Sequence, residues 1–209
     1  ITQTPIEVIT NGYDSNDNFK LNLDIKFTLS HIGTLLSNRN PIVLWEALSE
    51  LCSENPEFSK DLLIQLAGSV SDAILISIQK YGLMDQCIAL GYLSHQKAIQ
   101  LQYNSQVLLL IEMNLPETKA IIPGKLFEYL AAKRPILAIG PVDSDVEKII
   151  EETNSGSYFD YSEKEKLKKQ IGLFYSEYRE GHLTLNSKGL SKFSRKTLTS
   201  KMSDLIKSL

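Results

Sequence analysis

Short apolar runs alternate with amphipathic stretches along most of this chain. The runs that predict strands cover residues 25–29, 62–67, 87–93, 106–113, 136–139 and 157–161. Some of them, such as Val107–Ile111, are apolar at every position and not only at every second one. Strands of that kind are buried on both faces, which is typical of a parallel sheet covered by helices.

The stretches between these runs repeat apolar residues at three- and four-residue spacing, which predicts helices. Prolines and small polar residues mark several of the first turns. The predicted helices run from Pro41, after Asn40 as N-cap, to about Cys52; from a cap at Ser71 or Asp72 to about Lys80; from a cap at Ser94 to about Asn104; from Pro123 to Arg134; onward from a cap at Asp143 or Ser144; and over Glu163–Arg179 and Leu190–Leu209.

This alternation predicts a Rossmann-like, doubly wound α/β fold of about six parallel strands, followed by C-terminal helices. Residues 23–162 form the predicted domain and residues 163–209 the C-terminal helices. Before them, Ile6–Ile9 resembles a strand, and residues 13–22 are polar and turn-rich like a linker. The chain also lacks an initiator Met, so we expect an excised piece of a longer protein, with residues 1–22 ending its preceding domain.

One helix start carries the best candidates for binding. Gly124, Lys125 and Glu128 lie on its polar side, and the chain reaches it directly after a predicted strand. Free N–H groups and a lysine at a helix start attract anions, and a carboxylate one turn further can accept hydrogen bonds from vicinal hydroxyls. The pattern suggests a nucleotide with its ribose. An ordinary solvated helix with a Lys and a Glu explains the spacing equally well, with Lys133 and Arg134 at its negative end.

Composition narrows the function classes. With 209 residues, 43% hydrophobic content and a net charge of −3, the chain is of globular type and has no basic footprint for nucleic acid. No apolar run approaches the length of a membrane span. The Gly-x-Gly-x-x-Gly and Gly-Lys-Ser/Thr motifs are missing, which argues against a nicotinamide oxidoreductase and a P-loop NTPase. Cys52 and Cys87 lack metal-ligand spacing, so we expect reduced thiols and no metal site.

Residues 123–138, Pro-Gly-Lys-Leu-Phe-Glu-Tyr-Leu-Ala-Ala-Lys-Arg-Pro-Ile-Leu-Ala, resemble the signature of retaining glycosyltransferases of the GT-B architecture, family 4. Three weaker pieces agree in order: residues 9–19, residues 27–33 with 39–41, and residues 88–91. The resemblance covers roughly residues 6–155. It implies one half of a GT-B fold, the C-terminal half that holds the donor sugar.

The resemblance further implies an enzyme that moves a sugar, with retention, from a nucleotide diphosphate sugar to a hydroxyl of a glycan, lipid or small molecule. The expected setting is bacterial glycan or cell-surface polysaccharide synthesis in the cytoplasm, with peripheral membrane contact through the missing half. No metal cofactor is expected. The acceptor would bind to an N-terminal domain that this chain lacks, so the fragment alone should transfer little sugar.

The resemblance assigns roles to individual residues. Glu128 would bind the ribose hydroxyls, and Gly124 and Lys125 would face the diphosphate. Gly91 and Leu93 would border the base through backbone groups.

The family's first-strand glycine corresponds to Gly33. Its usual cations one and six residues later are here Thr34 and Arg39, and Arg39 can hold phosphate through two hydrogen bonds. The family's first glutamate, which contacts the transferred sugar, is replaced by Ala120, with Glu117 nearby. Ala120 and Thr34 keep open the alternative of a non-catalytic nucleotide-sugar-binding domain. A nucleotide-sugar 2-epimerase shares the architecture and is a further alternative, although no motif for its acid–base residues is present.

A few other residues have simpler explanations than binding. We expect His31, at a strand exit, to make a structural hydrogen bond more readily than a ligand contact, and Trp45 to lie in the core. Asp143-Ser144-Asp145 has the spacing of a metal motif, but its place at a helix start favours capping. The Lys-rich run of residues 163–169 is typical of a solvated helix face.

Overall fold

The computed structural model describes residues 6–14, 19 and 21–208. The strands are β1 Phe27–Ile32, β2 Leu62–Ala67, β3 Cys87–Gly91, β4 Val107–Ile111, β5 Ile136–Gly140 and β6 Gly156–Asp160. The α-helices are α1 Ile42–Glu54, α2 Pro56–Asp61, α3 Asp72–Lys80, α4 His95–Asn104, α5 Gly124–Ala132, α6 Asp145–Thr153, α7 Lys164–Arg179 and α8 Arg195–Lys207. Short 3-10 turns are η1 Ser37–Arg39, η2 Met84–Gln86, η3 Pro116–Thr118 and η4 Leu190–Phe193.

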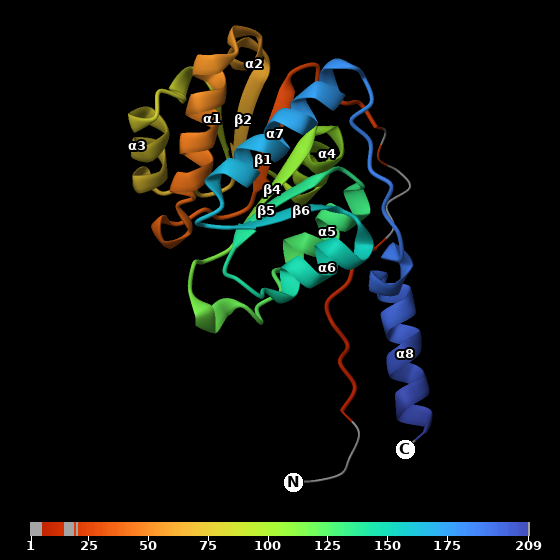
Figure 1. Ribbon diagram of the computed structural model, residues 1–209. Coiled ribbons are helices and arrows are strands. Elements are labelled where there is room, and N and C mark those ends of the chain that lie inside the picture. Colours follow the sequence, from red (N-terminus) through yellow and green to blue (C-terminus); the bar gives the residue numbers. More distant parts are fainter. Residues whose placement is uncertain (1–5, 15–18, 20, 209) are drawn as a thin grey trace.

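The described strands form one parallel sheet in the order β3-β2-β1-β4-β5-β6, with β1 and β4 side by side at its centre (Figure 1). The order reverses between β1 and β4, which is the switch point of a doubly wound fold, where ligands bind beyond the carboxyl ends of the strands. The predicted Rossmann-like α/β fold is therefore confirmed.

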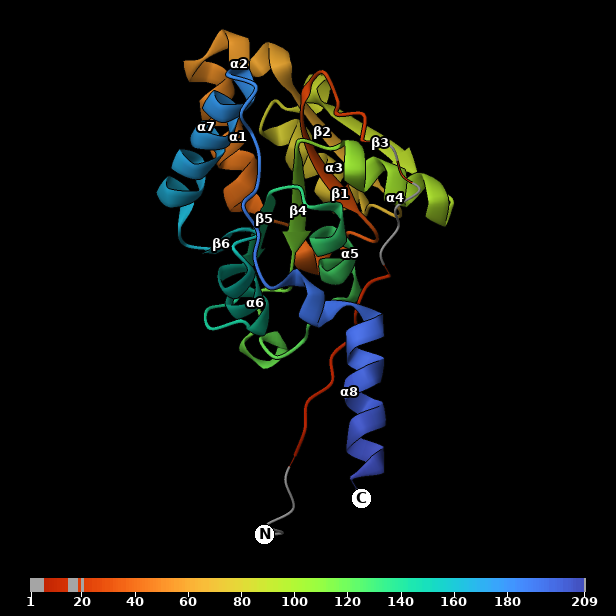
Figure 2. The same ribbon diagram turned by 90° about the vertical axis from the view of Figure 1, so that its right-hand side faces the viewer.

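Two apolar layers cover the sheet. Odd-numbered residues of β4, such as Leu109, face the layer of α1, α2, α3 and α7, while Leu108 and Leu110 face the layer of α4, α5 and α6. Figure 2 shows α1 and α7 on one side of the strands and α4 and α5 on the other. Trp45 of α1 is fully buried, as predicted, and its indole N–H donates to Asn40.

The first strand lies two to three residues further along the chain than its pattern indicates. Ser30 and His31, expected at the strand exit, are buried inside β1. They fit because each has a partner: the Ser30 hydroxyl donates to Gln65, and His31 hydrogen-bonds the carbonyl of Leu109. Such pairing offsets the cost of burying polar groups.

Other boundaries differ for similar local reasons. The strand expected at residues 6–9 has no regular secondary structure. Pro41, not Asn40, is the N-cap of α1, because Asn40 accepts the hydrogen bond from Trp45. The edge strand β3 is partly exposed, with Ile88 44% accessible, so burial on both faces was wrong for this strand. Arg134 does not close α5: its guanidinium is buried and donates to the backbone of Ser105, among other groups.

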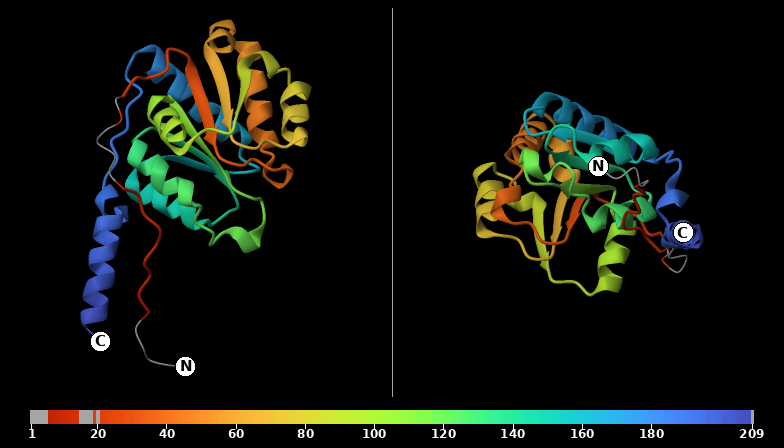
Figure 3. Two further views of the ribbon diagram at one scale, coloured as in Figure 1. Left: turned by 180° about the vertical axis from the view of Figure 1, so that it is seen from behind. Right: turned by 90° about the horizontal axis from the view of Figure 1, so that it is seen from below.

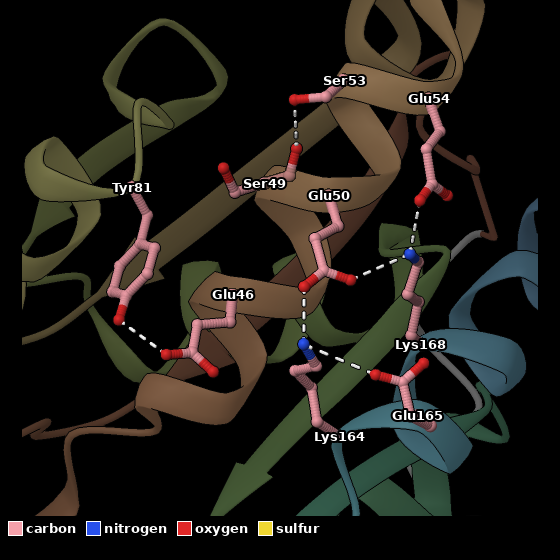
Figure 4. Close-up of polar contacts among 9 residues, drawn as sticks. All are labelled: Glu46, Ser49, Glu50, Ser53, Glu54, Tyr81, Lys164, Glu165 and Lys168. Carbon is pink, nitrogen blue, oxygen red and sulfur yellow. Dashed lines mark hydrogen bonds and ion pairs between the residues drawn. The ribbon is translucent and has the colours of Figure 1, made fainter.

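Helix α7 packs on α1 through an ion-pair cluster as well as through apolar contacts (Figure 4). Lys164 Nζ lies 2.6 Å from Glu50 Oε1, and Lys168 Nζ lies 2.9 Å from Glu50 Oε2 and 2.6 Å from Glu54 Oε1. Two lysines of the run expected to be solvated are thus paired with a neighbouring helix.

The two ends of the described chain run beside each other, away from the sheet (Figures 1 and 3). The predicted helix over residues 190–209 is broken at Ser194, which caps α8 after η4. Tyr13 pairs with Ser194, and the Arg195 guanidinium lies 2.6 Å from the Asp14 carboxylate. None of the residues of α8 is buried, although the structure describes all of them. Among the described residues, no helix is both long and apolar enough to cross a membrane.

Candidate functional site

Two glycines let the chain turn closely at the carboxyl ends of the central strands. Gly33 after β1 has φ +124°, and Gly68 after β2 has φ +112°. Their backbones touch, because a Cβ at position 68 would lie 2.6 Å from the Gly33 carbonyl oxygen. Both positions require glycine. The missing side chain at Gly33 leaves space above β1 for a side chain from the neighbouring helix.

Lys125 of α5 occupies that space. Its Nζ lies 3.2 Å from His31 Nε2, and a Cβ at position 33 would be 2.8 Å from it. Burial and then the charge of Lys125 lower the pKa of His31 to about 3, so this imidazole is neutral. With its Nδ1–H donating to the Leu109 carbonyl at 3.1 Å, His31 presents Nε2 as an acceptor for the lysine. The prediction that His31 makes a structural hydrogen bond is correct. However, His31 lies inside β1 and not at its exit, and its second partner, Lys125, is a candidate site residue.

Arg39 joins Lys125 at the rim of the sheet. It ends η1, and both residues line a small pocket of about 30 Å³ at the end of β4, which we call the β4-end pocket. Burial, and then the Arg39 charge, lower the pKa of Lys125 to about 8, while Glu128 acts in the opposite direction. Among the described residues, neither cation forms an ion pair with a carboxylate, so the two positive charges suit an anion. Thr34 lies between Gly33 and Arg39 in sequence and is exposed.

A larger pocket of about 260 Å³, the α4–α5 pocket, opens beside the same helix start. Gly124 and Glu128 of α5 line it, and a Cβ at position 124 would meet nothing within 4 Å, so a ligand can approach this backbone. The remaining described lining residues come from α4, α5 and the two chain ends: Asn11, Gly12, Tyr13, Asp14, His95, Ile99, Gln102, Tyr103, Ala131 and Arg195.

Neighbouring residues at the start of α5 line the two pockets. Gly124 lines one pocket and Lys125 lines the other. The first N–H groups of a helix have no partner within it, and the helix dipole is positive at this end. The arrangement therefore combines an anion site of two cations and a helix start with a half-buried carboxylate, Glu128, one turn away.

Gly91 and Leu93 lie at the end of β3, on the same rim. Gly91 is exposed with φ +63°, and its carbonyl accepts a hydrogen bond of 2.7 Å from the Gly68 N–H. Leu93 is half-buried against the α4–α6 layer. Among the described lining residues of the α4–α5 pocket, His95 is nearest to them in sequence. Their backbone contact with a base stays a prediction.

The sequence interpretation missed Glu112, which follows β4 and is 6% exposed. Ser144 Oγ donates to its carboxylate at 3.0 Å and Tyr158 Oη at 2.9 Å, both to Oε2. Burial raises the pKa of Glu112 to about 7, although these hydroxyl groups act against the shift. It lines the β4-end pocket with Arg39 and Lys125. Glu112 could have been recognised from sequence, because it is a single charged residue directly after the apolar run of residues 107–111.

The loop that contains Ala120, where the family has its first glutamate, is described throughout and places no carboxylate of its own in the β4-end pocket. Ala120 is exposed, and Glu117 is exposed in η3, while Thr118 and Ile121 of the same loop line the β4-end pocket. Ser144, between Asp143 and Asp145, caps α6 by accepting from the Val146 N–H, as the capping interpretation predicted. Among the described residues, no group of three or more His, Cys, Asp and Glu side chains is placed to hold a metal ion.

Comparison with solved structures identifies the architecture. Anabaena HepE, solved with UDP and glucose, superposes with a TM-score of 0.71 at 16% identity, over 97% of this chain and 57% of that one. The lipopolysaccharide outer core galactosyltransferase WaaB gives a TM-score of 0.68 at 12% identity, over 97% and 55%. Sucrose-phosphate synthase from Thermosynechococcus elongatus gives 0.68 at 13%, over 97% and 52%.

The chain has the fold of one half of a GT-B glycosyltransferase. It spans little more than half the length of these three proteins. No protein-family model and no curated protein matches the sequence.

Proposed function

We propose that this chain is the donor-binding domain of a glycosyltransferase that uses a nucleotide diphosphate sugar. The observation that supports the proposal is that consecutive residues at the start of α5 line the two pockets. Lys125 and Arg39 supply charge for a diphosphate in one pocket, and Glu128 supplies acceptors for ribose hydroxyls in the other. The distance of one helical turn between Lys125 and Glu128 fits a nucleoside diphosphate lying across the helix start.

The same groups can assist the reaction. When the bond between sugar and diphosphate breaks, negative charge grows on the leaving phosphate. Lys125 and Arg39 line the β4-end pocket, and their cationic groups, with the first N–H groups of α5, would stabilise that charge. In this proposal the cations do the work that a metal does in other transferases. Gly33 lets Lys125 lie close to the strand end.

The complete reaction would use a second domain for the acceptor, a hydroxyl of a glycan or lipid, and would retain the anomeric configuration. We propose a role in the synthesis of a bacterial glycan or surface polysaccharide at the cytoplasmic side of the membrane. The chain spans about half of its structural neighbours, so it should bind donor and transfer little sugar by itself.

Calorimetric titration with UDP, GDP and ADP, and then with their sugars, tests the proposal. We expect one base to be bound, with Glu128→Ala lowering the affinity roughly ten- to hundredfold because hydrogen bonds to a charged group are lost. Lys125→Ala should weaken binding of the same nucleotide and of pyrophosphate. The matched controls are Glu151→Ala and Lys169→Ala, at exposed positions of α6 and α7. A folded wild-type chain that binds none of the nucleotides would refute the nucleotide site.

A second function, nucleotide-sugar binding without transfer, is favoured by one observation. Ala120 and Glu117 leave no carboxylate from their loop at the β4-end pocket, where the transferred sugar would lie. Turnover by the complete protein separates the two functions. Release of the nucleotide from the nucleotide sugar that the titration shows to be bound supports transfer, whereas tight binding without such release supports the non-transferring function.

A further inference from the structure

Gln102 is the polar residue of α4 that is buried in the wall of the α4–α5 pocket. Its side chain is 1% exposed, and the only other buried residue of this helix, all of which the structure describes, is Ile99. The amide Nε2 donates to Glu128 Oε2 at 2.8 Å. A glutamine buried in this way has little freedom of its own, so the hydrogen bond comes from a fixed position on the neighbouring helix.

The bond determines which way the Glu128 carboxylate turns. A carboxylate offers about four acceptor positions on its two oxygens, and the amide occupies one of them on Oε2. Glu128 is half-buried and lines the pocket, and the remaining acceptor positions of its carboxylate are the ones that a ligand would use. Two hydroxyls of a ribose need such a carboxylate in a single orientation.

Without the amide, Glu128 would have a competing partner. Lys125 lies one turn earlier on α5, close enough for the Glu128 charge to act on its pKa, although burial and Arg39 lower that pKa by more than Glu128 raises it. If these two side chains paired, the ribose acceptor and the diphosphate cation would neutralise each other. Gln102 holds the carboxylate on the α4 side, while His31 holds the ammonium over Gly33. The two charges are thereby kept apart and available.

We propose that Gln102 is a positioning residue that presents Glu128 to the vicinal hydroxyls of a ribose and keeps it from pairing with Lys125. The inference rests on the proposed nucleotide-binding function. It makes Gln102 a determinant of the preference for ribonucleotides over 2′-deoxyribonucleotides, although it need not touch the ligand itself.

The test compares UDP with 2′-deoxy-UDP on the 209-residue chain, with the corresponding pair for GDP or ADP if that base is the one bound. We expect wild type to prefer the ribonucleotide roughly tenfold or more, since one hydrogen bond to a carboxylate is lost in the deoxy form. Gln102→Leu should lower UDP affinity roughly five- to tenfold and bring the ratio near one. Pyrophosphate affinity should fall less than UDP affinity, because it is lowered only as far as the released Glu128 pairs with Lys125. Gln96→Leu, at an exposed position of the same helix, is the matched control.

Two further variants keep the test independent of folding losses. Gln102→Glu places a second carboxylate against Glu128, so UDP affinity should be low at pH 8 and recover toward pH 5, where a shared proton restores the hydrogen bond. In Glu128→Ala, adding Gln102→Leu should change nothing further. Thermal melting confirms that each variant is folded.

The outcomes separate the two proposals. A wild-type chain that binds no nucleotide refutes the proposed function. A wild type that prefers UDP over 2′-deoxy-UDP, together with a folded Gln102→Leu that keeps that preference, overturns only the role of Gln102. A fall in pyrophosphate affinity that persists when Gln102→Leu is added to Glu128→Ala would also overturn it, because that loss would not act through Glu128.

Discussion

The ammonium of Lys125 is held by an uncharged imidazole. A carboxylate in place of His31 would pair with the lysine and cancel its charge, whereas the neutral Nε2 of His31 fixes its position and leaves the full charge for a ligand. The Leu109 carbonyl, in turn, selects the tautomer of His31. A lone histidine near a strand end thus serves to orient a cation without titrating near neutral pH.

Nucleotide affinity should therefore depend on pH through Lys125. Its pKa of about 8 means that the free chain loses this charge as the pH rises above 8, and the attraction for a diphosphate is lost with it. We expect affinity for the bound nucleotide to fall up to about tenfold per pH unit above that point, with proton uptake on binding. Titrations from about pH 7 to 9.5 measure this.

Lys125→Met is expected to bind weakly and to lose the fall in affinity above pH 8, where Glu112, with its pKa of about 7, is already ionised. Lys169→Met, at an exposed position of α7, keeps the wild-type slope. A flat profile in the wild type would contradict the shifted pKa of Lys125.

Some site residues can be predicted from sequence and others cannot. Gly124, Lys125 and Glu128 share one helix start, so helical spacing alone puts them on one side. Gln102 and Glu112 have their partners through contacts between elements. Gln102 of α4 bonds Glu128 of α5, 26 positions away, and Glu112 at the end of β4 bonds Ser144 at the start of α6, 32 positions away. Local pattern contains no signal for such pairings.

At the scale of elements, the sheet was predictable because apolar runs identify buried strands with little ambiguity. The short helix α2 was not, because its single buried side chain, Phe58, gives no helical repeat. Its start could have been recognised from chemistry: Asn55 precedes Pro56, and the Asn55 side chain accepts from the N–H groups of Glu57 and Phe58 at 3.0 and 3.2 Å.

Asn55→Ala should destabilise the chain by about 1 kcal/mol, because the cap that starts α2 and positions Phe58 is lost. Urea unfolding measures the change as a lower midpoint with an unchanged slope. Asn114→Ala, at an exposed loop position, is the control and should stay within about 0.5 kcal/mol of wild type. Equal midpoints for the Asn55 variant and wild type would show that the cap contributes nothing.

At the scale of the whole molecule, the α4–α5 pocket is built from both ends of the described chain. Gly12 and Asp14 come from one end and Arg195 from the other. The two ends fit tightly, since a Cβ at position 12 would lie 2.5 Å from the Phe193 carbonyl oxygen and 2.6 Å from Leu198 Cδ1. This side of the pocket could not be predicted from sequence, because it depends on how the start of α8 packs against residues 12–14.

Gly12→Val should push the two ends apart and weaken nucleotide binding severalfold, while the domain still unfolds cooperatively at nearly the wild-type temperature. Calorimetry and thermal melting, performed on the same sample, distinguish the two effects. Gly172→Ala in α7 is the control: its Cβ meets nothing within 4 Å and a helical alanine is favoured, so binding should not change. Unaltered nucleotide affinity in Gly12→Val would show that this wall is not part of the site.

The shared wall also has a mechanical consequence. A ligand that gains contacts with residues 11–14 and Arg195 only when they lie together lowers the free energy of that arrangement. By reciprocity, whatever fixes or pulls these two segments changes the ligand's affinity by the same factor. Ligand affinity then depends on whether the two segments lie together. A force that separates the two ends would lower the affinity for the nucleotide while the residues of the sheet keep their positions.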